Sequence, residues 1–190
     1  MSSDKLTVSK DDVENFRKTC IWLRSLWLHY QILFKERELL QSIAPIFFSD
    51  IHYLLQRNLV LVICNITDPA ETGDHMNLTV EFLIKYSDFS SAPRNISDKL
   101  KELGESMRAF RKKIVLARNK LIAHLDRESV QLGQPLGGAP QDDWLQFWHD
   151  LQGFLHIMHK HYVDADSPFW LNAIAQSDAE ILVQALKEST

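Results

Sequence analysis

The sequence is organised around one short stretch, Ala117-Arg118-Asn119-Lys120-Leu121-Ile122-Ala123-His124-Leu125-Asp126. Wound as a helix at about 100° per residue, this stretch and the residues before it form an apolar arc with Arg118 near its centre. The arc contains Ile114, Val115, Ala117, Leu121, Ile122 and Leu125. A guanidinium keeps its proton, so an arginine on such a face needs a carboxylate or another anion beside it. Because His124 lies at one edge of the arc and Asn119 and Asp126 at the other, this stretch is the first candidate for a functional site.

The composition is that of an ordinary globular protein and excludes some functions. The chain has 190 residues, of which 45% are hydrophobic and 24% charged, enough for one domain with a sizeable core. Only 6 glycines and 6 prolines are present, which argues against a loop-rich β fold. The net charge of −4 excludes a globally basic nucleic-acid-binding protein, so RNA binding would need a local basic patch.

The cysteines and the N-terminal residues predict an intracellular setting. Cys20 and Cys64 lie in apolar helical patterns without metal-binding or redox spacing, which is typical of buried thiols in a reducing compartment. Residues 1–5 are polar and lack the apolar core of a secretion signal. The longest apolar run, Leu59 to Cys64, is far too short to span a bilayer. We therefore expect a cytoplasmic protein with no membrane partner.

Helical periodicity predicts the secondary structure. The spacing of apolar residues gives helices over about 11–36 (continuing toward 43), 45–66, 80–86, 95 or 97 into the motif, 141–162 and 178–187. Their ends are marked by Ser9 with Asp12, Pro45, Asp68-Pro69, Thr79, and Ser177 with Glu180. Loops are expected at 70–77, 87–93 and 131–140.

These elements predict an all-α fold. We expect a bundle of about four long helices with short accessory helices, because no strand pattern or internal repeat is present. Residues 1–190 should form one domain, with its core at about 9–163 and a helical appendage at about 167–190. The helix at 45–66 is apolar around most of its circumference, which predicts a central position in the bundle.

Two further groups of residues need interpretation. The run from Arg108 to Lys120 contains no acidic residue, so it is either an RNA-binding patch or a solvated helix face. Its candidate RNA-binding residues are Arg108, Arg111, Lys112 and Lys113. The histidines of the helix at 141–162 are His149, His156, His159 and His161. Ordinary surface histidines are the favoured interpretation over a metal site, because no convincing further ligand accompanies them. Without a glycine-rich phosphate loop, no cofactor is expected either.

The motif and its surroundings resemble the HEPN superfamily. Its signature is an arginine, usually followed by a polar residue, and then a histidine near the end of a long helix. Here Arg118-Asn119 is followed by His124, with five intervening residues after Arg118. The order of features is similar to the AbiU-like branch associated with phage abortive infection. Those features, spanning about Pro45 to Asp126, are Phe47-Phe48, Leu59 through Asp68-Pro69, Asn77-Leu78-Thr79 and the motif itself.

The resemblance implies a function and a partner. It implies a homodimer whose two motifs meet at the interface, and in active members a metal-independent endoribonuclease of toxin or phage-defence type. The products would carry 2′,3′-cyclic phosphate and 5′-hydroxyl ends. A cognate antitoxin is a further partner that the resemblance admits. Some relatives carry a tyrosine, modified by an antitoxin, two positions after the histidine, whereas this chain has Asp126 there.

The residue types of the motif suit this chemistry. RNA supplies its own nucleophile, the 2′-hydroxyl, so cleavage needs proton transfer and positive charge on the phosphate. His124, with an ordinary pKa of about 6.5, could transfer the proton, and Arg118 could hold the phosphate through its planar fork. Asn119 could orient the phosphate or the imidazole, with Asp126 and Lys120 in support.

Other readings of these residues stay open. Arg118 could instead pair with Asp126 or another carboxylate inside the chain, with His124 only a residue near a helix end. The alternatives to a nuclease are a non-catalytic nucleotide- or RNA-binding module and a structural dimeric interaction domain.

Helix geometry restricts how the two catalytic candidates can act together. On an unbroken helix, Arg118 and His124 are separated by about 9 Å along the axis and about 120° around it. They would diverge and could not easily share one phosphate. Either the helix deforms within the motif, or a two-fold axis supplies the second copy of each residue.

Overall fold

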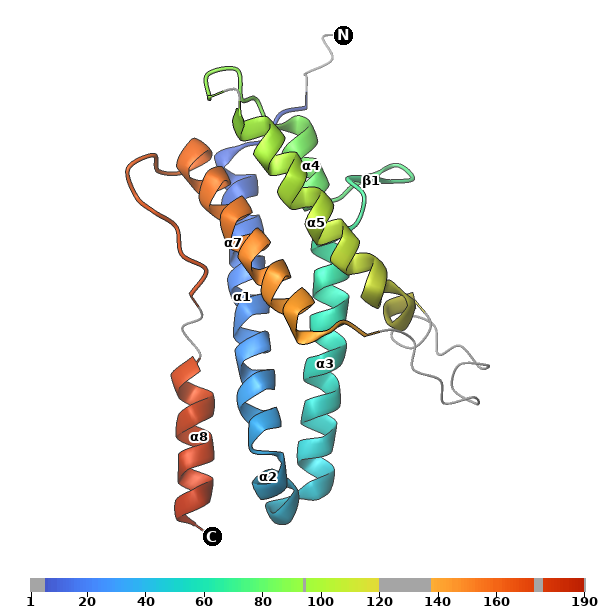
Figure 1. Ribbon diagram of the computed structural model, residues 1–190, viewed down its shortest axis with the longest axis vertical. Coiled ribbons are helices and arrows are strands. Elements are labelled where there is room, and N and C mark those ends of the chain that lie inside the picture. The colour runs from blue at the N-terminus through green and yellow to red at the C-terminus, as the bar shows by residue number, and fades with distance from the viewer. Residues whose placement is uncertain (1–5, 94, 120–137, 173–175, 190) are drawn as a thin grey trace.

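Helices make up nearly all of the regular structure in the computed structural model, which describes residues 6–93, 95–119, 138–172 and 176–189 (Figure 1). The helices are α1 (Lys10–Lys35), α2 (Arg37–Ile43), α3 (Pro45–Thr67), α4 (Val80–Tyr86), α5 (Asn95–Ala117), α7 (Gln141–Tyr162) and α8 (Gln176–Glu188). A two-stranded hairpin, β1 (Glu71–Thr72) and β2 (His75–Met76), follows α3. The predicted all-α fold is confirmed.

The architecture is a long helical hairpin crossed by a second pair of helices. α1 and α3 run side by side and are joined by α2, while α5 and α7 pack together across their upper half (Figure 1). α8 lies along the lower part of α1, where Lys187 Nζ is 3.0 Å from Glu36 Oε1. The largest fully buried side chains come from α1, α3, α4, α5 and α7: Phe16, Leu23, Leu59, Ile63, Leu83, Leu100, Met107, Phe147, Leu151, Phe154, Leu155 and Met158.

Local sequence signals set most helix boundaries. Ser9 and Asp12 form the expected capping box at the start of α1, and Thr79 accepts the Phe82 N–H at the start of α4. Pro45 occupies the first turn of α3. The last helix differs slightly, because it begins at Gln176 rather than at Asp178.

Only the second half of α3 is central, so the predicted central position is wrong for its first half. Buried residues of α3 begin at Leu59, whereas Ile46, Phe47, Tyr53 and Leu54 are 49–79% exposed. The physical reason is that α5 and α7 cover only the upper half of the α1–α3 hairpin (Figure 1). By length and composition alone α3 is also the one described helix that could cross a membrane, a test that core helices of soluble proteins pass too. Apolar surface on α3 is therefore left uncovered by the described chain.

The segment expected as a loop at 70–77 contains the β1–β2 hairpin. Glu71 pairs with Met76 and Thr72 with His75. Gly73 at the turn has φ +59°, a conformation that glycine adopts without strain. Strands of two residues show no alternation of polar and apolar positions, so periodicity could not predict them.

α4 packs closely on α5 next to this hairpin. Gly104 of α5 lies where a β-carbon would be 2.6 Å from Ile84 Cδ1 and 3.3 Å from Val80 Cγ1. Gly153 of α7 has its nearest neighbour, Leu103 Cδ1, at 3.6 Å, which is an ordinary contact. Both glycines lie inside helices and differ mainly in the room around them.

We predict opposite consequences for alanine at these two positions. Gly153→Ala should raise the free energy of unfolding by about 0.5–1 kcal/mol, because alanine restricts the unfolded chain. Gly104→Ala should be less stable than Gly153→Ala by about 1–3 kcal/mol, because the added methyl must push the end of the Ile84 side chain aside and crowds Val80. Urea unfolding followed by circular dichroism measures both, and equal stability of the two variants would contradict the close contact.

Candidate functional site

Three segments meet at Arg118. α3 ends at Thr67, and Asp68 follows in an extended conformation (φ −65°, ψ 163°), as expected before a proline. The chain then forms the β1–β2 hairpin and returns through Thr79 to α4. Ion pairs from Asp68 to Arg111 and Arg118 show that the end of α3 lies beside the last turns of α5.

Asp68 joins Arg111 of α5 and Arg118, which directly follows α5. Its Oδ1 accepts a hydrogen bond from Arg111 Nη2, and its Oδ2 lies 3.7 Å from Arg118 Nη2. The two arginines are seven residues apart, which places them two turns apart on one helix face. The exposed fractions of the side chains are 20% for Asp68, 24% for Arg111 and 30% for Arg118. A partly buried carboxylate of the same chain is therefore one partner of Arg118.

The hydrogen bonding of Arg118 is incomplete. Its Nη1 donates to Asn119 Oδ1 at 2.9 Å, while its contact with Asp68 is long for a hydrogen bond. Its Nε is buried and has no hydrogen-bond partner within the part of the chain that the structure describes. A guanidinium carries five N–H donors, so Arg118 retains capacity for an anionic ligand.

The helix changes geometry at the motif. α5 is α-helical up to Ala117, and Arg118 and Asn119 continue it in a wider, π-helical turn. Such turns are frequent at functional sites, because they displace side chains from the regular helical spacing. The regular α-helix therefore ends at Ala117, before the motif's arginine. Of the two arrangements that helix geometry allowed, a deformed helix or a two-fold axis, the structure shows the deformation at Arg118 and Asn119.

The remaining motif candidates, His124, Lys120 and Asp126, lie outside the described residues. The structure thus brings together Arg118 and Asn119 and adds Asp68, which sequence reasoning identified only as the end of a helix. The signal that could have found it was the position of an acidic residue directly before Pro69. Nothing in the sequence, however, indicated that this carboxylate would face α5.

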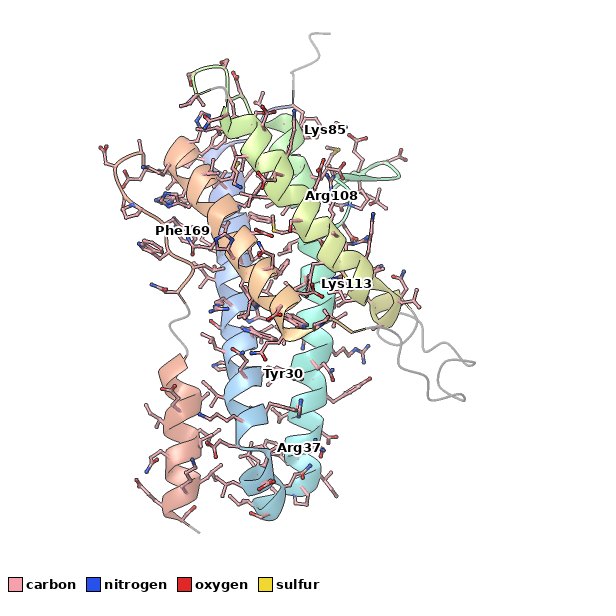
Figure 2. The ribbon with its side chains drawn as sticks, viewed as in Figure 1. Tyr30, Arg37, Lys85, Arg108, Lys113 and Phe169 are labelled. Carbon is pink, nitrogen blue, oxygen red and sulfur yellow. The ribbon has the colours of Figure 1, made fainter. Side chains whose placement is uncertain are left out.

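The basic residues of α5 face different neighbours. Arg108 Nη1 lies 3.8 Å from Glu81 of α4, and Lys113 Nζ lies 2.7 Å from Asp143 of α7. Figure 2 shows Arg108 and Lys113 at different levels of α5. Lys112 is exposed. Because Arg111 pairs with Asp68, these candidate RNA-binding residues do not form one uniform basic face, and their role in RNA binding stays a prediction.

An open pocket of about 620 Å³ lies beside Arg118. Its walls come from the end of α3, from the hairpin and from the segment leading to α4. They consist of Asn65, Asp68, Thr72, His75, Met76, Asn77, Leu78, Thr79 and Arg118. The pocket thus combines one cation and one carboxylate with neutral hydrogen-bonding groups and two apolar side chains.

The histidines of α7 do not converge on one point. The expected surface position is wrong for His159, which is buried where α7 packs on α1, with its Nδ1 3.0 Å from Arg17 Nη1. His161 Nε2 lies 2.8 Å from the carbonyl oxygen of Asp88. Burial, followed by the charge of Arg17, lowers the pKa of His159. Among the described residues, no group of three His, Cys, Asp or Glu side chains is placed to hold a metal ion.

Both cysteines are buried, as expected. Burial raises the pKa of Cys64 to about 11 and that of Cys20 further. The thiolate is the reactive form of cysteine, so neither residue is suited to nucleophilic chemistry at neutral pH.

The Asp68 ion pairs should contribute to stability. Asp68→Asn keeps the shape but removes the charge between two partly buried guanidinium groups, so the free energy of unfolding should fall by about 1–3 kcal/mol. Asp143→Asn, which breaks the more exposed pair with Lys113, should change it by less than about 1 kcal/mol. Urea unfolding at pH 7 compares the two variants. Equal losses of unfolding free energy would show that the Asp68 ion pairs stabilise the fold no more than the exposed Lys113–Asp143 pair does.

Comparison with known proteins places this geometry in a family. The HEPN family model described as AbiU2 matches residues 10–181, which include α3, the hairpin, α5 and α7. No significant match was found among curated proteins or solved structures. The family match covers nearly the whole chain, and it agrees with the helical fold and with the arginine at the end of α5. The chain belongs to the AbiU2 family of HEPN proteins.

Proposed function

We propose that this protein is a metal-independent endoribonuclease of abortive-infection type, acting as a homodimer. The observation that carries the proposal is the state of Arg118, which lines an open pocket and whose ion pair with Asp68 is long at 3.7 Å. Membership of the HEPN AbiU2 family supports the same reading. In the cell the enzyme would act in the cytoplasm as a toxin or phage-defence effector, restrained by an antitoxin or by a trigger of infection.

In this proposal Arg118 binds the scissile phosphate. The long contact with Asp68 describes a resting state. In this state the carboxylate is a weak partner of one amino group of the guanidinium while substrate is absent. Phosphate can replace it because a guanidinium binds phosphate oxygens through two parallel hydrogen bonds. Asn119 Oδ1 accepts from Arg118 Nη1 and thereby orients the guanidinium. Lys120 and Asp126 are assigned supporting roles.

His124 is assigned the proton transfers. The 2′-oxygen attacks the neighbouring phosphorus, its proton passes to a base, and the 5′-oxygen leaves with a proton from an acid. Two imidazoles are needed for a concerted version, one as base and one as acid. A homodimer provides them as His124 and His124 of the partner subunit. The nucleophile belongs to RNA, so the reaction requires no metal-bound water.

The exposed stripe of α3 supports a dimer interface next to the site. Phe47 and Leu54 are exposed, and the half-buried Leu61 follows them at the same interval of seven residues, so the three lie on one side of α3. Asn65 and Asp68 continue this side after four and three more residues and line the Arg118 pocket. Leu116, two residues before Arg118, is 51% exposed. A second copy covering this stripe would therefore lie at the edge of the site.

RNA cleavage tests the proposed activity. Purified wild-type protein should cleave total RNA in the presence of EDTA, leaving 2′,3′-cyclic phosphate ends. Arg118→Ala and His124→Ala should lower the rate by about 100-fold or more, because each removes charge stabilisation or proton transfer. Lys101→Ala, at the exposed far half of α5, is the matched control and should cleave like wild type.

The outcomes separate the candidate functions. Absence of cleavage in wild type, or equal cleavage by all variants, would reject the nuclease. RNA binding that is lost in Arg118→Ala without any cleavage would support a non-catalytic RNA-binding module. If the protein neither binds nor cleaves RNA, a structural interaction domain is the candidate function that remains.

A substitution in the apolar stripe tests the composite site. Leu54→Asp, at a position 49% exposed, should yield a monomer of 22.1 kDa with little RNA cleavage, because a charge in an apolar interface is poorly solvated. Leu145→Asp, at a position of α7 that is 54% exposed, should remain a dimer with full activity. Light scattering and the cleavage assay measure both. A monomeric Leu54→Asp that cleaves RNA at the wild-type rate would refute the composite site.

A further inference from the structure

The hairpin wall of the Arg118 pocket is held firmly by hydrogen bonds. The Asn77 N–H donates to the carbonyl oxygen of Ala70, and the Ala70 N–H donates to Glu81 Oε2. On the outer side, Glu71 accepts hydrogen bonds from Lys85 and Tyr86 of α4, and Figure 2 shows Lys85 at the end of that helix. The wall is thus a fixed surface beside Arg118.

The amide of Asn77 is fixed in one orientation. Its Nδ2 donates to the carbonyl oxygen of Pro69 at 3.1 Å and to Thr72 Oγ1 at 2.9 Å. A carbonyl oxygen accepts only, so the nitrogen must face Pro69. Both donors are used, and the group that Asn77 can offer a ligand is its Oδ1, an acceptor. The Asp68 carboxylate, on the same pocket, also only accepts.

The other lining groups suit a flat, partly apolar ligand. Met76 and Leu78 are 45% and 37% exposed, and His75 presents an exposed aromatic ring. Asn65 is exposed and adds an amide at the edge. A volume of about 620 Å³ lies in the ordinary range for small-ligand sites. Proteins recognise single-stranded RNA by stacking bases on aromatic side chains and by hydrogen bonds to the base edges.

We propose that this pocket binds one base of single-stranded RNA, next to the phosphate held by Arg118, and that it discriminates against uracil. Asn77 Oδ1 matches the amino group of cytosine or adenine and repels the carbonyl oxygen at the corresponding position of uracil. Asp68 Oδ2, whose contact with Arg118 is long at 3.7 Å, adds a second acceptor on the same pocket. The same carboxylate makes a second phosphate a poor occupant. His75 provides the stacking surface. The inference rests on the proposed function, because it places the base beside the scissile phosphate.

Binding of non-cleavable RNA tests the pocket without requiring catalysis. Fluorescein-labelled heptamers with 2′-O-methyl ribose, of all-cytosine and all-uracil sequence, are titrated with full-length protein and followed by anisotropy. The cytosine heptamer should bind about tenfold more tightly than the uracil heptamer. His75→Ala should weaken the cytosine complex about five- to tenfold through lost stacking. His149→Ala, which removes an exposed histidine from α7, should bind like wild type.

The failures of the pocket and of the nuclease are distinguishable. If the protein cleaves RNA but binds both heptamers equally, and His75→Ala has no effect, the pocket proposal is overturned and the nuclease stands. If cytosine is preferred and His75→Ala abolishes the preference, while no RNA is cleaved, the base pocket is supported and the nuclease is rejected. Weakening by His149→Ala to the same extent would also overturn the pocket, because it would indicate a diffuse contact.

Discussion

The carboxylate of Asp68 connects the end of α3 to the end of α5 at the candidate site. It lies at the end of α3, and it contacts Arg111 and Arg118 on the last turns of α5. Without a counter-charge, two guanidinium groups on one partly buried face would repel each other and would lose hydration. Asp68 therefore fixes where α5 ends relative to α3. The hairpin that follows Pro69 is positioned by the same residue, so the pocket beside Arg118 depends on it as well.

Local signals in the sequence were sufficient for most of the helices. Capping residues, prolines and apolar spacing act within a few residues, and they predicted α1, α3, α4 and α7 to within about two residues. The exposed first half of α3 shows where such signals fail. Its apolar residues cover most of the helix circumference, and periodicity cannot indicate that α5 and α7 cross only over the second half. Which neighbour covers a face is decided by tertiary packing.

The sequence predicted that Arg118 needs an anionic partner, but it did not predict which residues surround it. An arginine on an apolar arc correctly indicated that Arg118 requires an anionic partner. The partner, Asp68, is distant in the sequence, and only the fold brings its carboxylate to α5. The pocket could not be predicted for a related reason. Thr72, His75 and Asn77 lie in a short segment without periodicity, and only the hairpin brings their side chains to one pocket. The roles of His124, Lys120 and Asp126 remain those that the sequence predicts.

In the proposed enzyme, α3 contributes both to the dimer interface and to the pocket that binds RNA. Its exposed stripe begins with Phe47 and Leu54 and ends with Asn65 and Asp68, which line the pocket. A second copy bound to the stripe would approach the same pocket, so formation of the dimer and access of RNA would be coupled through one helix. The length of the Arg118–Asp68 contact is important for such coupling, because a tight pair would resist replacement by phosphate. In the proposed enzyme, the long contact with Asp68 keeps a counter-charge near the Arg118 guanidinium without substrate and leaves its terminal amino groups able to bind a phosphate.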